Sequence, residues 1–267
     1  MVDKVIELTG CNKEDLLDDF KKVHQKYQNT EHPYSLLETK IVLNLYPNKT
    51  KAELKKIFAP AFQVFEESKN KNLKKYPYVN ETFEILIQNN IKLAAHTESG
   101  LYAVSDRLQR LDLTKYFSII YCRERPAPQS LVTSYGEKII SEFPMHKIIE
   151  LSHHQRKPDP TVLLEICDNL NTDSNHAVYI GDSMARDVLM AKDAGIFSIW
   201  AAYGTNHPKN HFKDLVRVTH WREEDVEREE KLYEASKNLK PDYIAKNNFN
   251  EILMSFDIGV NQNSINS

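Results

Sequence analysis

The apolar positions of the first 75 residues follow the 3.6-residue period of amphipathic helices rather than the alternation of strands. One apolar face begins after Asn12 and comprises Leu16, Leu17, Phe20, Val23 and Tyr27. Thr50 is followed three residues later by Glu53, which is the pattern of a capping box and predicts a helix that runs to Phe58. The segment 1–75 is therefore predicted to be a small, all-helical domain.

From residue 76 onward, short apolar runs alternate with amphipathic segments. The runs predicted to be strands are 91–95, 117–122, 177–180 and 196–202. The segments predicted to be helices are 80–89, 101–111, 161–169 and 184–194. Short buried strands that alternate with helices are typical of a parallel sheet covered on both faces. Residues 76–258 are therefore predicted to form an α/β domain built on a Rossmann-like parallel sheet.

Three segments fall outside this alternation. Residues 123–151 give no clear assignment, although 129–142 has the pattern of a helix. The run 221–239 has a high density of charges, which is typical of a solvated helix. Residues 259–267 are predicted to be a disordered tail.

The composition is that of an ordinary core-forming chain. Of its 267 residues, 41% are hydrophobic and 27% are charged, which excludes wholesale disorder. The formal net charge of −3 provides no global field for a phosphate backbone, so nucleic acid is not expected as a partner. No apolar run approaches the roughly 18 residues that span a bilayer, and no signal peptide is recognisable, so no membrane partner is expected. Cys11, Cys122 and Cys167 are far apart and odd in number, which favours free thiols in a reducing cytoplasm.

Polar residues follow the predicted strands, and ligands of open parallel sheets gather beyond the carboxyl ends of the strands. Thr97 and Ser99 come after the first strand, in a turn that either cradles an anion or is simply a turn. Lys157 precedes Pro158, and Asp159 is the N-cap of a helix. This stiff backbone suits a lysine that must aim at a charge, and a helix start with an incidental lysine fits equally well. No acidic partner is evident in the local sequence, so Lys157 is expected to contribute anion binding and little stability.

Two acidic residues are predicted near the tip of the strand 177–180. Asp182 directly follows Gly181, and Asp187 lies five residues later in the first turn of the next helix. Two carboxylates at one sheet edge repel each other unless a cation joins them, and Mg²⁺ is commonly held by one or two carboxylates together with phosphate and water. Asp187 has an alternative role, because an acidic residue in the first turn interacts favourably with the helix dipole.

The three motifs, taken together and in this order, resemble those of the haloacid dehalogenase (HAD) superfamily of hydrolases. The nearest resemblance is to phosphoglycolate-phosphatase-like members that carry a helical cap. The motifs are Thr97-x-Ser99 after a strand, then Lys157-Pro158-Asp159-Pro160, then Gly181-Asp182-Ser183-x₃-Asp187. The resemblance extends over roughly residues 1–258, with residues 1–75 as the cap.

This resemblance implies a Mg²⁺-dependent phosphatase that acts on a small phosphorylated metabolite. It assigns Thr97 and Ser99 to phosphate binding and Lys157 to neutralising the nucleophile and the phosphate. It makes Asp182 a direct Mg²⁺ ligand and Asp187 a supporting acidic residue nearby. Thr97 and Lys157 are the catalytic residues that the resemblance supplies.

One part of the family pattern is not in this sequence. The family's chemistry starts from an Asp-x-Asp motif at the tip of a strand, where the first Asp attacks phosphorus and the second acts as general acid and base. The 267 residues contain no Asp-x-Asp. The resemblance places this strand centrally, between the strand that ends at His96 and the one that ends at Ile180. The chain is therefore expected to be N-terminally incomplete and inactive as given, with 147–151 as a candidate to fill the central position.

Two classes of function remain open from the sequence. The first is an enzyme, a phosphatase seen without its nucleophile strand. The second is a binding module, a degenerate relative that holds phosphate or a partner protein without turnover. A phospho-receiver domain also combines a Thr and a Lys with an acidic cluster, but it is much shorter than this chain and has no helical cap.

Overall fold

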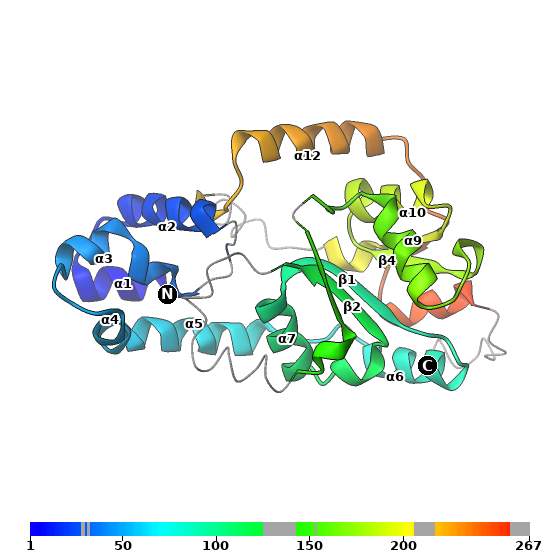
Figure 1. Ribbon diagram of the computed structural model, residues 1–267, viewed down its shortest axis with the longest axis horizontal. Helices are drawn as coiled ribbons and strands as arrows, with labels where there is room; N and C mark the ends of the chain where they lie inside the picture. The colour runs from blue at the N-terminus through cyan, green and yellow to red at the C-terminus, as the bar shows by residue number, and fades with distance from the viewer. Residues whose placement is uncertain (28–29, 31–32, 125–142, 153, 206–216, 257–267) are drawn as a thin grey trace. The chain divides into compact units, whose positions relative to one another are not determined.

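The computed structural model describes residues 1–27, 30, 33–124, 143–152, 154–205 and 217–256 (Figure 1). Contacts divide the chain into two compact units. Among the described residues, the first unit consists of Met1–Lys74 together with 217–226, and the second unit consists of 75–124, 143–205 without 153, and 227–256. Each unit is described by itself below.

The first unit is helical in all of its described secondary structure, as its apolar period predicts. Thr50 and Glu53 form the expected capping box: the Glu53 N–H donates to the Thr50 side chain, and the Thr50 N–H donates to the Glu53 carboxylate. Leu16, Phe20 and Phe58 are almost fully buried at the centre of this unit. The helices are α1 (Val2–Thr9), α2 (Lys13–Tyr27), η1 (Pro33–Glu38), α3 (Lys40–Leu45), α4 (Lys51–Ile57) and α5 (Ala59–Asn72).

A buried histidine connects α2 to the distant segment 217–226. The Nδ1 atom of His24 lies 2.6 Å from the Val218 carbonyl oxygen, and its Nε2 lies 2.8 Å from Ser35 Oγ. Because a carbonyl only accepts, Nδ1 carries the proton and Nε2 accepts from the Ser35 hydroxyl. Burial lowers the pKa of His24 below its usual value, and the bond to Val218 offsets part of this effect. The ring is therefore neutral at physiological pH.

The described residues of the second unit form six strands in two separate three-stranded sheets, both fully parallel. Their orders are β1-β2-β3 and β4-β5-β6. The α/β class with parallel strands agrees with the sequence prediction, but no strand among the described residues joins the two sheets into one. The strands are β1 (Ala94–Gly100), β2 (Ile119–Arg123), β3 (Ile148–Leu151), β4 (Val178–Gly181), β5 (Phe197–Ala201) and β6 (Tyr243–Ala245).

Helices and short helical turns connect these strands. The predicted helix 184–194 is divided into a π-helical turn, η6 (Met184–Val188), and α10 (Leu189–Asp193), and Gly195 ends it with a φ of 68°. In the part of the chain that the structure describes, no helix is both long enough and apolar enough to cross a bilayer. The other helices are α6 (Val79–Gln88), α7 (Leu101–Arg110), η2 (Thr114–Tyr116), η4 (Met145–Lys147), α9 (Pro160–Asn169), η5 (Ser174–His176), η7 (Ala202–Thr205), α12 (Glu223–Ser236) and η8 (Phe249–Ser255).

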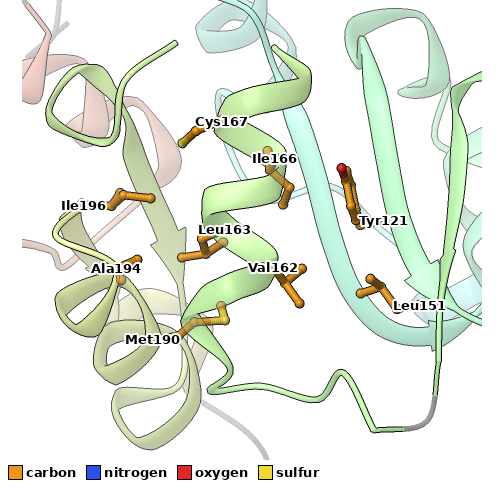
Figure 2. Packing of buried hydrophobic residues seen from close by; sticks show 10 residues of the cluster. Tyr121, Leu151, Val162, Leu163, Ile166, Cys167, Met190, Ala194 and Ile196 are labelled. Atoms are coloured by element: carbon orange, nitrogen blue, oxygen red, sulfur yellow. The ribbon is translucent and has the colours of Figure 1, made fainter. Parts of the chain in front are cut away.

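The helix α9 packs against both sheets. Figure 2 shows Val162 on the side of Leu151 from β3, whereas Leu163 lies on the side of Ile196, which leads into β5. Both residues of α9 are 2% exposed or less. Because fully burying an aliphatic side chain contributes about 1.5–3 kcal/mol, this helix holds the two sheets together without backbone pairing between them.

A second apolar cluster covers the opposite face. Phe83 from α6 packs with Ile199 of β5 and with Ile180 of β4. The same cluster includes Leu93 and Phe117, which lead into β1 and β2. On this face the first sheet has a further cluster of its own, in which Ile120 and Cys122 of β2 pack with Leu101 and Val104 of α7. Both faces of the strands are therefore covered by apolar layers, as expected for buried parallel strands.

Two of the sequence expectations are wrong in detail. The first strand was expected over 91–95 with a turn after it, but β1 begins at Ala94 and continues to Gly100, with a register shift between His96 and Gly100. Residues 147–151 were a candidate for the central position, but β3 pairs with the outer side of β2, with Ile148 opposite Ile120. An apolar pattern indicates that a segment is buried, but the strand with which it pairs depends on the whole sheet. The predicted helix 129–142 and tail 259–267 lie outside the described residues.

We expect the stability of the first unit to fall below about pH 6.5 because of His24. Its folded pKa is lowered, so the unfolded state binds more protons, and stability is complete above the unfolded pKa and lost as the pH falls toward the folded value. The loss should be about 1 kcal/mol per pH unit in this window. Urea unfolding followed by circular dichroism at about pH 8 and about pH 5.5 measures it.

The control for this prediction is a second histidine. His24→Gln should reduce the pH dependence, whereas His176→Gln should leave it unchanged because the His176 side chain is 72% exposed. Equal pH dependence in the wild type and in His24→Gln would contradict the assignment.

Candidate active site

A buried ion pair lies at the carboxyl end of β4. Lys157 Nζ is 2.7 Å from Asp187 Oδ1, and the two side chains are 15% and 5% exposed. The Tyr179 hydroxyl donates to the same carboxylate oxygen at 3.3 Å, and the Ser183 N–H donates to the other oxygen at 3.0 Å. The Asp187 carboxylate is thus bonded through both of its oxygens, which is what a buried charge requires.

The loop before α9 positions the lysine as the sequence predicts. Asp159 is the N-cap of α9 and accepts a hydrogen bond from the Thr161 N–H at 3.0 Å, with Pro160 in the first turn. The carbonyl of Lys157 accepts a hydrogen bond from the Arg228 guanidinium. These contacts fix the backbone of the loop from which the Lys157 side chain extends.

Gly181 provides the room for Asp187. A Cβ atom at position 181 would lie 2.3 Å from Asp187 Cγ, which is closer than real Cβ contacts come. Any side chain at this position would displace the carboxylate from Lys157. The glycine of the Gly-Asp-Ser motif therefore has a packing role, because it leaves the space that the Asp187 side chain occupies.

The structure gives Lys157 an acidic partner that was not evident in its local sequence, and this contact argues against the expectation that the lysine contributes little stability. Its partner is Asp187, 30 residues further along the chain, which local sequence could not reveal. Burial alone would lower the pKa of Lys157, but the neighbouring Tyr179 and Asp187 raise it above the ordinary value. The lysine is therefore protonated at all physiological pH values.

The two predicted metal ligands have different surroundings. Asp182 is exposed at the strand tip, and its carbonyl accepts a hydrogen bond from the Trp200 indole at 3.0 Å. Asp187 is buried and turned toward Lys157. Within the described residues, no cluster of three or more His, Cys, Asp or Glu residues could hold a metal. These residues fit a Mg²⁺ ion only in part, with Asp182 as the available carboxylate.

The predicted phosphate-binding hydroxyls bond locally at the end of β1. Thr97 Oγ1 accepts from the Ser99 N–H at 3.1 Å, and Ser99 Oγ accepts from the Arg107 guanidinium at 3.1 Å. Among the hydrogen bonds of the described residues, none joins Thr97 or Ser99 to Lys157. The structure brings Lys157 and Asp187 together directly, while the two hydroxyls belong to the end of the neighbouring sheet.

Two features of this edge were not predicted from the sequence. His96 Nδ1 lies 3.5 Å from the Tyr179 hydroxyl, and burial, with the nearby Lys157 charge, lowers the pKa of His96 to about 3. Tyr179 falls inside a predicted strand and His96 directly follows one, and the apolar pattern gave no reason to single out either residue.

The second feature that was not predicted from the sequence is a network of ion pairs. Arg186 binds Glu98 at 3.2 Å and Glu229 of α12 at 2.7 Å. The charged run 221–239 was expected to be a solvated helix, and two of its residues, Arg228 and Glu229, instead contact this edge. The sequence signal for the role of Arg186 was its position between Asp182 and Asp187, the two acidic residues predicted near the strand tip.

Comparison with known proteins identifies the family. Residues 12–195, more than half of the chain, match the haloacid dehalogenase-like hydrolase family, and residues 154–247 match a related HAD-hydrolase-like family. The chain therefore belongs to the haloacid dehalogenase-like hydrolases. This agrees with the resemblance drawn from the three motifs.

Two individual relatives are named as phosphatases. A phosphorylated carbohydrates phosphatase of Thermotoga maritima is 28% identical over 182 residues, which is 68% of this chain and 65% of that protein. A glyceraldehyde 3-phosphate phosphatase of Methanopyrus kandleri is 25% identical over 193 residues, or 72% and 67% of the two chains. The chain thus spans about two thirds of the length of these relatives. The structure of a HAD phosphatase from Thermococcus onnurineus covers 78% of each chain, with 19% identity and a TM-score of 0.43.

We expect Lys157→Ala to lower the free energy of unfolding by about 3–5 kcal/mol, because it leaves the Asp187 charge buried without its partner. The double variant Lys157→Met/Asp187→Leu removes both charges and should be less destabilised than the single one. Chemical denaturation of the variants measures both effects.

The matched control is a more exposed ion pair of the same unit. Lys192 and Asp242 are 32% and 30% exposed, so Lys192→Ala should lower the free energy of unfolding by about 1 kcal/mol or less. If Lys157→Ala were no more destabilising than Lys192→Ala, the structural importance of the buried pair would be disproved.

Proposed function

We propose that the site belongs to a Mg²⁺-dependent phosphatase that acts on small phosphorylated metabolites. The observation that carries this proposal is the buried Lys157–Asp187 pair beside Asp182 at the carboxyl end of β4, in a chain of the haloacid dehalogenase-like family. The phosphatase names of the Thermotoga and Methanopyrus relatives support the reaction class and the phosphorylated substrate.

Lys157 is the proposed anchor for the phosphoryl group. An ammonium group has three N–H donors, and the contact with Asp187 uses one of them, so donors remain for phosphate oxygens. Because Asp187 and the loop before α9 fix its position, the lysine loses little freedom when a phosphate binds. Thr97 and Ser99 are the proposed hydroxyl partners from the end of β1.

Asp182 is the proposed Mg²⁺ ligand, and Asp187 supports the site by holding Lys157. When bound, Mg²⁺ neutralises charge on a transferring phosphoryl group. One exposed carboxylate is a weak metal site by itself. The remaining Mg²⁺ ligands in this proposal are phosphate oxygens of the substrate and water molecules.

The nucleophile is the part that these 267 residues do not supply, since they contain no Asp-x-Asp. Phosphate binding requires only the positioned charges, whereas a covalent route requires the attacking carboxylate. The alternative function is therefore a phosphate- or partner-binding protein without turnover, and the absence of Asp-x-Asp from the sequence is the observation that favours it.

We expect the 267-residue chain to hydrolyse none of a panel of phosphorylated sugars and phosphoglycolate in the presence of Mg²⁺. A fusion that places an apolar strand ending in Asp-x-Asp-x-Thr ahead of Met1 should gain Mg²⁺-dependent release of phosphate and a higher melting temperature. The same fusion with Asn-x-Asn in place of Asp-x-Asp should have the higher melting temperature but should release no phosphate. Mg²⁺-dependent hydrolysis by the unmodified chain would refute the predicted lack of turnover.

We expect Asp182→Asn to weaken Mg²⁺ binding by roughly tenfold or more, measured by calorimetry in the presence of a phosphate analogue such as tungstate. Asp193→Asn is the control, because Asp193 is also exposed but lies at the far end of α10. Equal losses in the two variants would show that Asp182 has no special role in metal binding.

A further inference from the structure

The charged helix α12 contacts both segments that carry the buried ion pair of Lys157 and Asp187. The contacts come from two consecutive residues, Arg228 and Glu229, in the part of α12 that belongs to the second unit. The Arg228 guanidinium donates a hydrogen bond to the carbonyl of Lys157. The Glu229 carboxylate accepts from Arg186, which directly precedes Asp187. One turn of a helix far along the chain thus touches the loop of the lysine and the turn of the aspartate.

The guanidinium of Arg186 is held on two sides. Its Nε donates to Glu229 Oε2 at 3.1 Å and its Nη2 lies 2.7 Å from Glu229 Oε1, which is a two-point arrangement that fixes direction as well as charge. Its Nη1 donates to Glu98 Oε2 at 3.2 Å. Because Arg186 lies in the π-helical turn η6 with Asp187, holding its side chain also holds the turn from which the Asp187 carboxylate reaches Lys157.

The attachment of α12 to this edge is polar. Of its 14 residues, only Ser236 is buried, and Tyr233 is 63% exposed. Among the apolar clusters of the described residues, none includes a residue of α12. The side chains of Arg186 and Glu229 are 23% and 24% exposed. The contacts of α12 with this edge can therefore be removed without disturbing the apolar core.

We propose that α12 positions the phosphate site, with Arg228 acting through the backbone of Lys157 and Glu229 acting through Arg186. Both are positioning residues, since neither contacts the phosphate in this proposal. The proposal rests on the proposed binding of phosphate by Lys157. It adds that the affinity for phosphate depends on a charged helix whose own sequence carries none of the motifs of the site.

The sign of the Glu229 effect separates positioning from simple electrostatics. Long-range repulsion predicts that removing a negative charge near the site strengthens the binding of an anion. Positioning predicts weaker binding, because Arg186 loses its two-point partner and the turn of Asp187 loses its support. Glu230 is the matched control, since it is the next residue of the same helix, carries the same charge and is exposed.

Calorimetric titration with tungstate and Mg²⁺ tests the proposal on the full 267-residue chain. We expect Glu229→Gln to weaken tungstate binding by roughly threefold to tenfold, whereas Glu230→Gln should leave it unchanged or slightly stronger. In an Arg186→Gln background, Glu229→Gln should have no further effect, because the contact through which it acts is already lost. Unchanged or stronger binding by Glu229→Gln, or additive losses in the double variant, would overturn the proposal.

Amide hydrogen exchange tests the positioning without any ligand. The N–H groups of Asp159 and Val188 are bonded to backbone carbonyls within the two segments that α12 contacts. We expect Arg228→Gln to speed exchange at Asp159, and Glu229→Gln to speed it at Val188, by roughly threefold or more at an unchanged melting temperature. Unchanged exchange at both positions would disprove the positioning role even if the chain binds tungstate. A wild-type chain that binds no tungstate would instead refute the proposed phosphate site, and exchange alone would then decide the role of α12.

Discussion

The packing of α9 against both sheets is the constraint on which the second unit depends. No described backbone hydrogen bond joins β1 to β4, so the sheets stay together through the apolar layers of α9 on one face and of α6 and η8 on the other. Apolar burial is non-directional, and it can hold two sheets at a distance that a hydrogen-bond ladder would not fix. The polar residues at the ends of β1 and β4 are brought to one edge by this packing.

The buried pair of Lys157 and Asp187 then organises that edge. Lys157 comes from the loop before α9, and Asp187 comes from the turn after β4, so the pair connects the bridging helix to one of the sheets it covers. Such a pair adds little net stability compared with apolar residues of the same shape, but losing one partner is strongly destabilising. Its main physical effect is to hold one charged donor in a fixed position.

The proposed function therefore separates the binding of a phosphate from its cleavage. The proposed binding of a phosphorylated ligand rests on the fixed ammonium group of Lys157, the exposed Asp182 and the membership in a family of hydrolases. Cleavage by the family's covalent route needs an aspartate at the tip of a strand, and this sequence has no Asp-x-Asp.

The sequence by itself determined the elements whose signals are local. The helical period of 1–75, the capping box at Thr50 and the parallel strands β2, β4 and β5 follow from spacing and from neighbouring residues, and so does the position of Lys157 before a helix. The order of the three motifs was also sufficient to indicate the hydrolase family, because motif order along the chain is a property of sequence alone.

Tertiary structure alone decided which distant residues meet. Asp187 as the partner of Lys157, Arg186 as the contact of Glu98 and Glu229, and the pairing of β3 with β2 each join residues many positions apart. The three-residue strand β6 and the extension of β1 to Gly100 were likewise unpredictable, because their own residues lack a strand pattern and their neighbours in the sheet define them. Local sequence sets what a segment tends to form, and packing of the whole unit sets what it contacts.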